Sequence, residues 1–257
     1  MSLLQAGFGS SAGDYTIDDS LRFRSSASAE LTRTFGTPTD NNKWTYSVWF
    51  KRGSLAGGYN TLFGRYLSGS NFIRADFLSD KFRLYQYVST TQISIQTEAV
   101  FRDPSAWYHL TLVMDTSNAT STDRVIFYVN GVRVTSFSSA TYPSVNLATA
   151  YNVSGGVTHR IGGLTAGDFD GYLTEVNFID GQALAPTDFG EFDDNGTWKP
   201  LAYTGTYGNN GFYLNGVGVT DQSGNGNNWT NNNLNLTTST ATTYDQMKDT
   251  PSLVDTN

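Results

Sequence analysis

The chain has 257 residues, of which 14% are aromatic and 15% charged, and its formal net charge at pH 7 is −7. An acidic chain without a cluster of Lys and Arg lacks the charge pattern of a nucleic-acid-binding surface. Because it contains no Cys, disulfides and thiolate metal sites are excluded. We also expect no membrane span and no signal peptide, since no apolar run approaches roughly 20 residues and the first residues lack a basic, apolar leader.

Residues 1–20 are small and polar, and they predict an extended arm that is ordered only where another surface holds it. Short runs then follow in which apolar and polar residues alternate. Their starts lie about 8–12 residues apart, which is the strand spacing of a sandwich or barrel. The strands predicted in this part are 21–23, 29–33, 44–50, 60–66, 71–78, 81–87, 93–100 and 107–114.

Asn130-Gly131 separates two runs rich in β-branched residues, 125–129 and 132–135. This dipeptide predicts a two-residue type I′ turn, because both central residues of that turn need a positive φ. The turn places Val129 opposite Val132 and so fixes the register of the hairpin. Since residues 125–129 are apolar at every position, they predict a central strand that is covered on both faces.

The rest of the chain predicts a polar loop over 136–156, further strands, one helical turn at 185–190 and a turn cluster at 221–228. The strands are 158–161, 169–179 and 211–215. From Thr237 onwards the chain is rich in Thr, Ser and Asp without periodicity, which predicts a tail that leaves the domain. The expected organisation is therefore an arm (1–20), one all-β antiparallel sandwich (21–236) and a polar tail (237–257).

Several separated motifs resemble one family. Trp107 to Val113, followed by Ile126 to Val132, is similar to the laminin-G/pentraxin-like signature of the concanavalin A-like lectin/glucanase superfamily. That resemblance implies a sandwich of jelly-roll type. Further stretches resemble a recurring domain of virion proteins from marine and cyanobacterial phages, and together the matches cover roughly residues 15–235. These stretches are 20–23, 44–53, 171–184, 189–191, 203–214 and 221–229.

The superfamily includes glucanases, so the carboxylates are the first candidate catalytic groups. A retaining glycosidase needs two carboxyl groups about 5 Å apart, and the resemblance implies that they come from an E-x-D-x-x-E strand. No Glu of the chain lies in such a motif. The nearest acids to Glu175 are Asp170 and Asp180, five positions away on either side, where a strand points them to its opposite face. We therefore expect no enzyme.

The two histidines do not suggest a catalytic site either. His109 lies between Tyr108 and Leu110 in a predicted strand, and His159 lies beside Arg160. Neither has an H-x-x-H partner or a triad-like neighbourhood in the sequence. We expect a structural role for both.

A calcium site is the alternative to a chain without cofactors. Laminin-G and pentraxin relatives carry Ca²⁺ on loops at the rim of the sandwich, and oxygen ligands suit this ion. Asp168 and Asp170 could supply carboxylates, and 193–195 forms a second oxygen-rich loop. The favoured interpretation is that Asp and Asn occupy these turns because they cap them and tolerate positive φ. We expect no cofactor, with Ca²⁺ as the exception to test.

Sugar binding would use flat aromatic rings on loops. Tyr59, Tyr142, Tyr151 and Tyr207 are the loop aromatics that fit this description. Exposed tyrosines are equally common in protein–protein contacts, and the sequence leaves both interpretations open. The Trp residues are expected to pack in the core or on sheet faces rather than to bind ligands.

The resemblance implies a non-enzymatic structural protein displayed on a bacteriophage virion, as a tail fibre or spike component or as a capsid decoration. Its role would be adhesion to glycans or to neighbouring subunits, after synthesis in the host cytoplasm. The expected partners are other virion proteins, a host surface glycan and further copies of the chain, with a trimer expected by analogy. A free-standing Ca²⁺-dependent lectin is the second interpretation, and a polysaccharide-degrading enzyme is the third.

Overall fold

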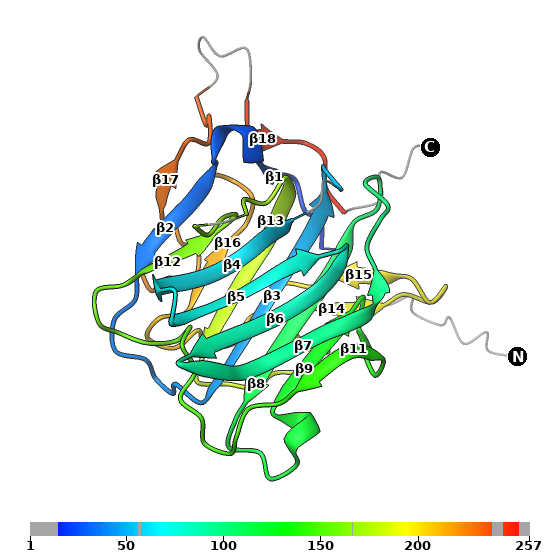
Figure 1. Cartoon of the computed structure of the whole chain (residues 1–257). Coiled ribbons are helices and arrows are strands. Elements are labelled where there is room, and N and C mark those ends of the chain that lie inside the picture. The colour runs from blue at the N-terminus through cyan, green and yellow to red at the C-terminus, as the bar shows by residue number, and fades with distance from the viewer. Residues whose placement is uncertain (1–14, 56–57, 166, 238–243, 252–257) are drawn as a thin grey trace, which may run out of the picture.

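A computed structural model of the chain describes residues 15–55, 58–165, 167–237 and 244–251. Within these residues the regular structure is almost entirely β, and two large antiparallel sheets pack face to face (Figure 1). This confirms the predicted antiparallel sandwich. The helical segments are single 3-10 turns, and no described helix has the length and apolar character needed to cross a membrane. They are η1 (Ser25–Ala27), η2 (Ser121–Asp123) and η3 (Pro186–Asp188).

The first sheet has the strand order β10-β9-β8-β3-β13-β1-β18, and β16 pairs with β13 further along the edge that β1 occupies. β3 and β13 lie at its centre and pair with each other over most of their length. The bounds of its described strands are β1 (Ser20–Phe23), β3 (Lys43–Arg52), β8 (Tyr108–Asp115), β9 (Val125–Val129), β10 (Val132–Arg133), β13 (Gly171–Asp180), β16 (Phe212–Leu214) and β18 (Gln246–Met247).

The second sheet has the order β11-β7-β6-β5-β4-β12-β2-β17. In Figure 1 its strands β4 to β7 form the layer nearest the viewer, and β3, β8 and β13 of the first sheet lie behind them. A separate two-stranded ribbon joins β14 (Gly190–Phe192) to β15 (Trp198–Pro200). The strands of the second sheet are β2 (Glu30–Thr34), β4 (Tyr59–Ser68), β5 (Asn71–Leu78), β6 (Lys81–Val88), β7 (Thr90–Val100), β11 (Phe137–Thr141), β12 (Thr158–Ile161) and β17 (Thr230–Asn232).

The core between the sheets is rich in aromatic side chains, and β3 contributes its largest members. Trp44, Tyr46, Val48 and Phe50 are all buried against the second sheet, as the strict alternation of this strand predicts. Each buried side chain of this size contributes about 1.5–3 kcal/mol. The alternate positions of β3, including Trp49, point to the opposite face of the first sheet. That outer face carries the site described below.

The strand β9 differs from its prediction. Residues 125–129 were expected to form a central strand covered on both faces, and this is wrong. β9 is the second strand from the edge, and only Val125 and Phe127 are buried, while Ile126 and Tyr128 are half-buried. An apolar run therefore formed a strand with one covered face, since β-branched and aromatic residues also suit a half-buried sheet surface.

Five short strands lie where the sequence predicted no strand: β11, β14, β15, β17 and β18. Each consists of two to five residues, too few to show a period of their own. β11 pairs with the longer β7, and β17 pairs with β2. Their partner strands supply the register that their own sequences do not encode.

The expectation that the chain leaves the domain after Thr237 is wrong for residues 244–251, which we call the C-terminal strap. β18 of the strap pairs with β1. The carboxylate of Asp245 is fully buried and accepts hydrogen bonds from Arg22 Nε (3.0 Å) and from Arg24 Nε and Nη2 (2.9 and 2.8 Å). Near the N-terminal end of the described chain, Ile17, which belongs to the predicted arm, is buried as well.

Replacing Asp245 should loosen the strap. Burial alone would raise the pKa of Asp245, but hydrogen bonds from Arg24, the Asn235 amide and Arg22 outweigh it and lower the pKa. We expect Asp245→Asn to cost roughly 1–3 kcal/mol of unfolding free energy at pH 7, less than a fully buried pair because the arginines are partly exposed. Because the folded-state pKa is depressed, this difference should persist above about pH 4 and shrink as the pH falls through the folded-state value.

Urea unfolding from pH 2.5 to 7 measures this difference, with Asp103→Asn as the matched control. Asp103 is exposed, and its carboxylate accepts hydrogen bonds from the amide and the hydroxyl of Ser105 in its own turn. Equal stability of the Asp245→Asn variant and the wild type at pH 7 would contradict the role assigned to the strap.

Candidate functional site

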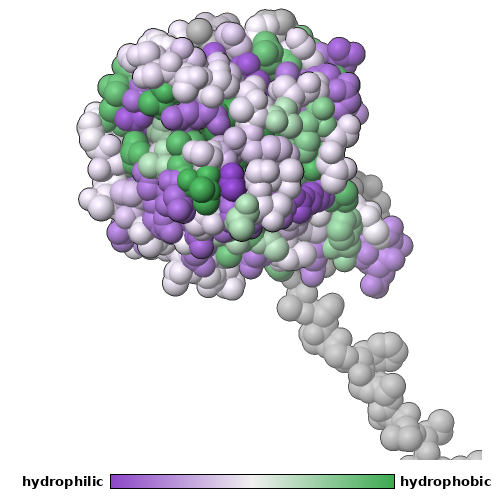
Figure 2. Space-filling view, turned by 60° about the horizontal axis from the view of Figure 1, so that its bottom comes forward, coloured by the Kyte–Doolittle hydropathy of each residue, from purple (hydrophilic) through white to green (hydrophobic). Residues whose placement is uncertain are grey.

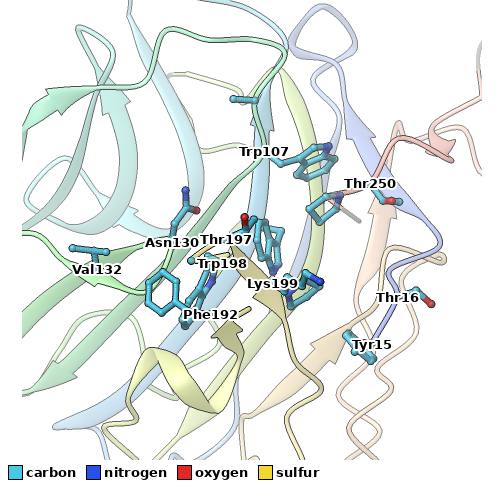
Figure 3. A pocket seen from close by; sticks show the side chains of 15 residues that line it. Tyr15, Thr16, Trp107, Asn130, Val132, Phe192, Thr197, Trp198, Lys199 and Thr250 are labelled. Atoms are coloured by element: carbon cyan, nitrogen blue, oxygen red, sulfur yellow. The ribbon is translucent and has the colours of Figure 1, made fainter. Parts of the chain in front are cut away.

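A pocket of about 630 Å³ lies on the outer face of the first sheet (Figure 3). Strand β3, the turn between β9 and β10, and the β14–β15 ribbon surround it together with both ends of the described chain. Most of the surface is aromatic or aliphatic. We call it the aromatic pocket, and its lining residues are Tyr15, Thr16, Trp49, Ala106, Trp107, Asn130, Val132, Phe192, Gly196, Thr197, Trp198, Lys199, Pro200, Thr250 and Pro251.

The base of the pocket is a stack of three rings. His109 on β8 lies between Trp49 of the neighbouring β3 and Trp198 of β15, with ring centroids 4.9 and 5.9 Å away. Both indoles are largely buried. Trp198 Nε1 donates a hydrogen bond to His109 Nδ1 (3.0 Å), so the histidine holds the ribbon against the sheet.

This bond also determines the tautomer of His109. An indole N–H can only donate, so Nδ1 accepts and Nε2 carries the proton, which it donates to Ser47 Oγ at 2.8 Å. Burial lowers the pKa of His109 to about 3, so the ring is neutral at physiological pH. A histidine that donates to a serine cannot take that serine's proton. The pair is therefore structural, as expected for His109.

The Asn130-Gly131 turn forms one side of the pocket and adopts the predicted geometry. Both residues have positive φ, +47° and +77°. Two hydrogen bonds join Asn130 to His109. The backbone N–H of Asn130 donates to the His109 carbonyl oxygen (2.9 Å), and the backbone N–H of His109 donates to Asn130 Oδ1 (2.8 Å). A Cβ added to Gly131 would lie 2.3 Å from Trp198 Cζ3. Glycine is thus required both by the turn and by the indole that packs on it.

The walls expose large apolar side chains to solvent. Phe192 is 52% exposed and Val132 61% exposed, and the ring of Phe192 meets Trp198 edge-on at 4.9 Å. Figure 3 shows Phe192 and Val132 on one side of the pocket, Trp107 and Thr250 on the other, and Trp198 and Lys199 between them. Exposed aromatic surface beside a concavity is characteristic of a binding site.

A few polar groups accompany this apolar surface. Asn130, Thr197, Lys199 and Thr250 lie in the lining, and Lys199 Nζ pairs with Asp193 at 3.5 Å. The indole N–H of Trp49 is buried and has no hydrogen-bond partner among the described residues. Apolar walls with a small number of polar groups give a ligand both contact area and orientation.

The strap closes the upper edge of the pocket. Trp107 Nε1 donates to Asp249 Oδ1 at 3.0 Å, and Lys51 forms an ion pair with the other oxygen of that carboxylate. Lys51 Nζ also lies over the Trp107 ring, 5.9 Å from its centroid. These contacts hold Trp107 in place and bring Thr250 and Pro251 to the pocket edge.

The lower edge is held by Glu175, the acid considered above as a catalytic candidate. Glu175 lies at a bulge in β13 with a φ of +50°, and it is 6% exposed. Tyr213 donates to its Oε1 (2.7 Å) and Tyr15 to its Oε2 (2.8 Å). Both oxygens are occupied by these tyrosines, and the carboxylate anchors the segment that brings Tyr15 to the pocket.

The described residues that line the aromatic pocket include no Asp, Glu, His, Cys or Ser. Glycoside hydrolysis by the usual routes needs two carboxyl groups beside the scissile bond. The described lining supplies neither of them.

The four predicted tyrosines are not gathered in one place, and none of them lines the aromatic pocket, although Tyr207 and Tyr142 line two other, separate pockets. Tyr151 is fully buried in the core, and Tyr207 is 8% exposed with its hydroxyl bonded to Asn177 (2.9 Å). Their prediction as exposed loop aromatics is wrong, because both rings fill space between packed elements. Tyr59 and Tyr142 are half-buried, the first beneath the Arg74 guanidinium and the second against the core.

The predicted calcium ligands do not gather either. Asp170 accepts hydrogen bonds from the amide and hydroxyl of Ser25 (3.2 and 2.9 Å), and Asp168 forms a β-bridge with Thr61. No group of three or more His, Cys, Asp or Glu able to hold a metal ion occurs in the part of the chain that the structure describes. Ca²⁺ takes six to eight oxygen ligands, which include carbonyl and amide oxygens as well as carboxylates. Calcium binding by Asp168 and Asp170 therefore stays a prediction. Asp193 caps its own turn.

Sequence reasoning missed the pocket because its tryptophans were assigned to packing alone. Trp49 and Trp198 do pack, yet they also form the base of an open concavity. Trp198 belongs to a strand that was not predicted, and Phe192 to its partner. The alternation of β3 did place Trp49 opposite the core, and this was the one signal for an aromatic outer face.

Comparisons with known proteins agree with the fold. The sequence profile of a family described as the concanavalin A-like lectin/glucanases superfamily matches residues 23–188. No curated protein matches the chain.

Several solved structures are similar in fold. A candidate carbohydrate-binding protein from Bacteroides ovatus is 15% identical with a TM-score of 0.54, and the match covers 85% of this chain and 59% of that one. A heptameric SAP-like pentraxin from Limulus polyphemus is 18% identical with a TM-score of 0.45, and the match covers 66% of this chain and 78% of that one. Domain 4 of a GH43 extracellular arabinanase from Geobacillus stearothermophilus is 22% identical with a TM-score of 0.41, covering 57% and 64%.

At these identities the likeness concerns the fold alone. The match spans less than two thirds of the Bacteroides ovatus protein and of the arabinanase domain. The Bacteroides ovatus protein, with a TM-score above 0.5, supports the sandwich architecture.

Gly131→Ala should displace Trp198 and open the base of the pocket. A left-handed conformation costs a non-glycine residue roughly 1–2 kcal/mol, and the clash with the indole adds to this. Gly218→Ala is the matched control, because Gly218 also has a positive φ (+68°) but nothing lies within 4 Å of its added Cβ. Urea unfolding and tryptophan fluorescence measure the difference. Equal loss of stability in both variants would show that the indole does not depend on Gly131.

Glu175→Gln should remove a pH dependence of the stability of the folded protein. Burial raises the pKa of Glu175 more than the hydrogen bonds from Tyr213 and Tyr15 lower it. Because the folded-state pKa is raised, the stability contribution of Glu175 is present below its ordinary value near 4.3 and is lost as the pH rises through the folded-state pKa. We expect the variant to gain stability relative to wild type between about pH 4 and 7, as measured by thermal unfolding, whereas the exposed control Glu191→Gln should follow wild type. A constant difference at every pH would contradict this assignment.

Proposed function

The chain belongs to the concanavalin A-like lectin/glucanases superfamily, and from this premise we propose that it is a non-enzymatic carbohydrate-binding module. The observation that carries the proposal is the aromatic pocket, in which Trp49, Trp107, Trp198 and Phe192 surround a concavity with few polar groups. Its volume of about 630 Å³ lies within the usual range of small-molecule sites, roughly 300–1,000 Å³.

Aromatic walls suit the chemistry of sugars. One face of a pyranose presents weakly polarised C–H groups, and these are attracted to the negative face of an aromatic ring. The hydroxyl groups around the sugar ring need hydrogen-bond partners, which Asn130, Thr197 and Thr250 can supply at the edge of the pocket. The exposed ring of Phe192 is available for stacking, and the indole of Trp107 is held ready by Asp249.

Binding rather than hydrolysis is supported by two features. The described lining lacks carboxylates, and Glu175 has both oxygens engaged by tyrosines. The stack of rings at the base is fixed by the hydrogen bonds of His109, which preorganises the pocket and limits the entropy lost on binding.

We further propose that the module acts as a structural protein on a bacteriophage virion, as a tail fibre, spike or capsid decoration. This part rests on the sequence resemblance of stretches such as 44–53 and 171–184 to phage virion proteins. The net charge of −7 suits a surface that stays soluble while displayed, and hydrophilic and hydrophobic residues are interspersed on the face shown in Figure 2. In that setting the module would adhere to a host surface glycan or to neighbouring subunits, as a homo-oligomer with other virion chains.

A Ca²⁺-dependent lectin is the alternative, and it has less support. The Asp170 carboxylate accepts hydrogen bonds from Ser25, and neither Asp168 nor Asp170 joins a larger group of acidic ligands among the described residues. We therefore propose that carbohydrate binding needs no metal ion and persists in the presence of a chelator.

Phe192→Ala and Trp107→Ala should each weaken carbohydrate binding by about tenfold or more, equivalent to about 1.4 kcal/mol. The wild-type protein is first screened on a glycan array with EDTA present, and calorimetry then measures the affinity of each variant for the oligosaccharide bound best. Phe192 is half-exposed, so its removal should leave the fold intact.

Tyr128→Ala is the control for this experiment. Tyr128 is a half-buried aromatic on the same outer sheet face, but it does not line the pocket. Binding that is unaffected by both pocket variants would place the sugar elsewhere, and loss of binding with EDTA would favour the Ca²⁺-dependent lectin.

A further inference from the structure

The outer face of the second sheet carries a row of aromatic rings far from the pocket. Tyr66 on β4, Phe72 on β5 and Tyr87 on β6 are directly opposite one another in the strand register. Neighbouring ring centroids are 6.1 and 6.0 Å apart, and the ring planes differ by only 28° and 24°. We call these three residues the outer aromatic row.

The row faces away from the core. Ile73 and Leu84, the inward-facing neighbours on β5 and β6, are completely buried and belong to the core cluster. The three rings of the row are half-buried and do not belong to it. An antiparallel sheet with one solvated face normally places polar residues there. Cross-strand aromatic pairs can stabilise a sheet, but a row across three strands also creates a flat apolar strip on the surface.

The charged groups beside the row are already paired. Arg83 holds the buried carboxylate of Asp76 with two hydrogen bonds of 3.0 and 2.7 Å, and Arg74 Nε lies 3.3 Å from the same carboxylate. The guanidinium of Arg74 also covers the ring of Tyr59 at 3.8 Å and approaches Phe72 at 5.3 Å. These arginines therefore support the surface rather than offer unpaired charge to a ligand.

The remaining neighbours of the row are neutral and polar. The hydroxyl of Tyr85, whose ring lies 5.8 Å from that of Phe72, is within hydrogen-bond distance of Thr91 Oγ1 (3.1 Å). On the turn at the end of β4, the hydroxyl of Ser68 lies within hydrogen-bond distance of that of Ser70 (3.1 Å). Hydroxyl groups of this kind can exchange hydrogen bonds with sugar hydroxyls.

We propose that the outer aromatic row is a second carbohydrate-binding surface, which takes the interior of a neutral, linear polysaccharide. A flat strip has no end wall, so it admits a chain that continues in both directions, whereas a pocket favours a short ligand or a chain end. The paired arginines and the chain's net charge of −7 disfavour an acidic polymer. The inference rests on the proposed carbohydrate-binding function and adds a second site and a ligand class to it.

The two sites lie on opposite faces of the sandwich, since the aromatic pocket is on the outer face of the first sheet. A ligand bound at one site does not cover the other site, so both sites can be occupied at once. Two weak sites on one rigid module increase the avidity for a surface that presents many glycan chains.

Native gel electrophoresis with polysaccharide in the gel tests this proposal. The probes are three neutral linear polymers, namely mixed-linkage β-glucan, glucomannan and pullulan, with polygalacturonate as the acidic comparison. We expect the full-length chain to be retarded by at least one neutral polymer and not by polygalacturonate. Phe72→Ala and Tyr87→Ser should each reduce that retardation at least fivefold.

Controls distinguish loss of binding at the outer aromatic row from loss of binding in the pocket and from unfolding of the variant. Trp107→Ala removes a pocket ring and should leave the retardation by the polymer unchanged, and so should Tyr128→Ala. Tyr87→Ser is included because Phe72→Ala removes the middle ring of the row, and thermal unfolding confirms that each variant is folded. If oligosaccharide binding in the pocket fails while the row variants abolish retardation, the proposed pocket is wrong and the row stands.

Any one of the following results would overturn the proposal: retardation by none of the neutral polymers, equal retardation of the folded row variants and wild type, or stronger retardation by polygalacturonate than by any neutral polymer. Loss of retardation in Trp107→Ala alone would assign polymer binding to the pocket and would also overturn it.

Discussion

The register of β3 connects the core of the sandwich to the aromatic pocket. Trp44, Tyr46, Val48 and Phe50 point inward and are buried, so the residues between them must point outward, among them Ser47 and Trp49. A shift of one residue would exchange the two sets and place polar groups in the core. Because the core holds β3 in one register, Trp49 has a fixed position at the base of the pocket. The site depends on the same pairing that stabilises the fold.

A second link joins the β9–β10 turn to the separate ribbon. Gly131 leaves room for Trp198, and His109 accepts the indole hydrogen bond of Trp198 while its backbone bonds Asn130. The turn, the sheet and the ribbon thus meet at one buried histidine whose tautomer is determined by its partners. A neutral, fully hydrogen-bonded imidazole has low cost in the interior. The preorganised base of the pocket follows from this arrangement.

Much of the fold could be predicted, because long strands with clear alternation and the Asn130-Gly131 turn carry their own signals. The site could not. The ribbon strand with Trp198 has only three residues, and its position depends on the contact of Trp198 with His109. The strap is polar and aperiodic, and its position depends on tertiary contacts such as that of Asp245 with Arg22. The same limit explains the tyrosines. Tyr151 has a loop sequence, yet its ring fills the core.

The face of the sheet on which an aromatic residue lies determines whether its ring packs in the core or reaches the surface. On β5 and β6, Phe77 and Phe82 point inward and are buried, whereas Phe72 and Tyr87 belong to the same strands and remain half-exposed. Composition cannot distinguish these two groups, and neither can a search for aromatics in loops. Parity within a strand can distinguish them once its register is known. A binding surface built on strands is also more rigid than one on loops, since ladder hydrogen bonds and the core beneath hold each ring.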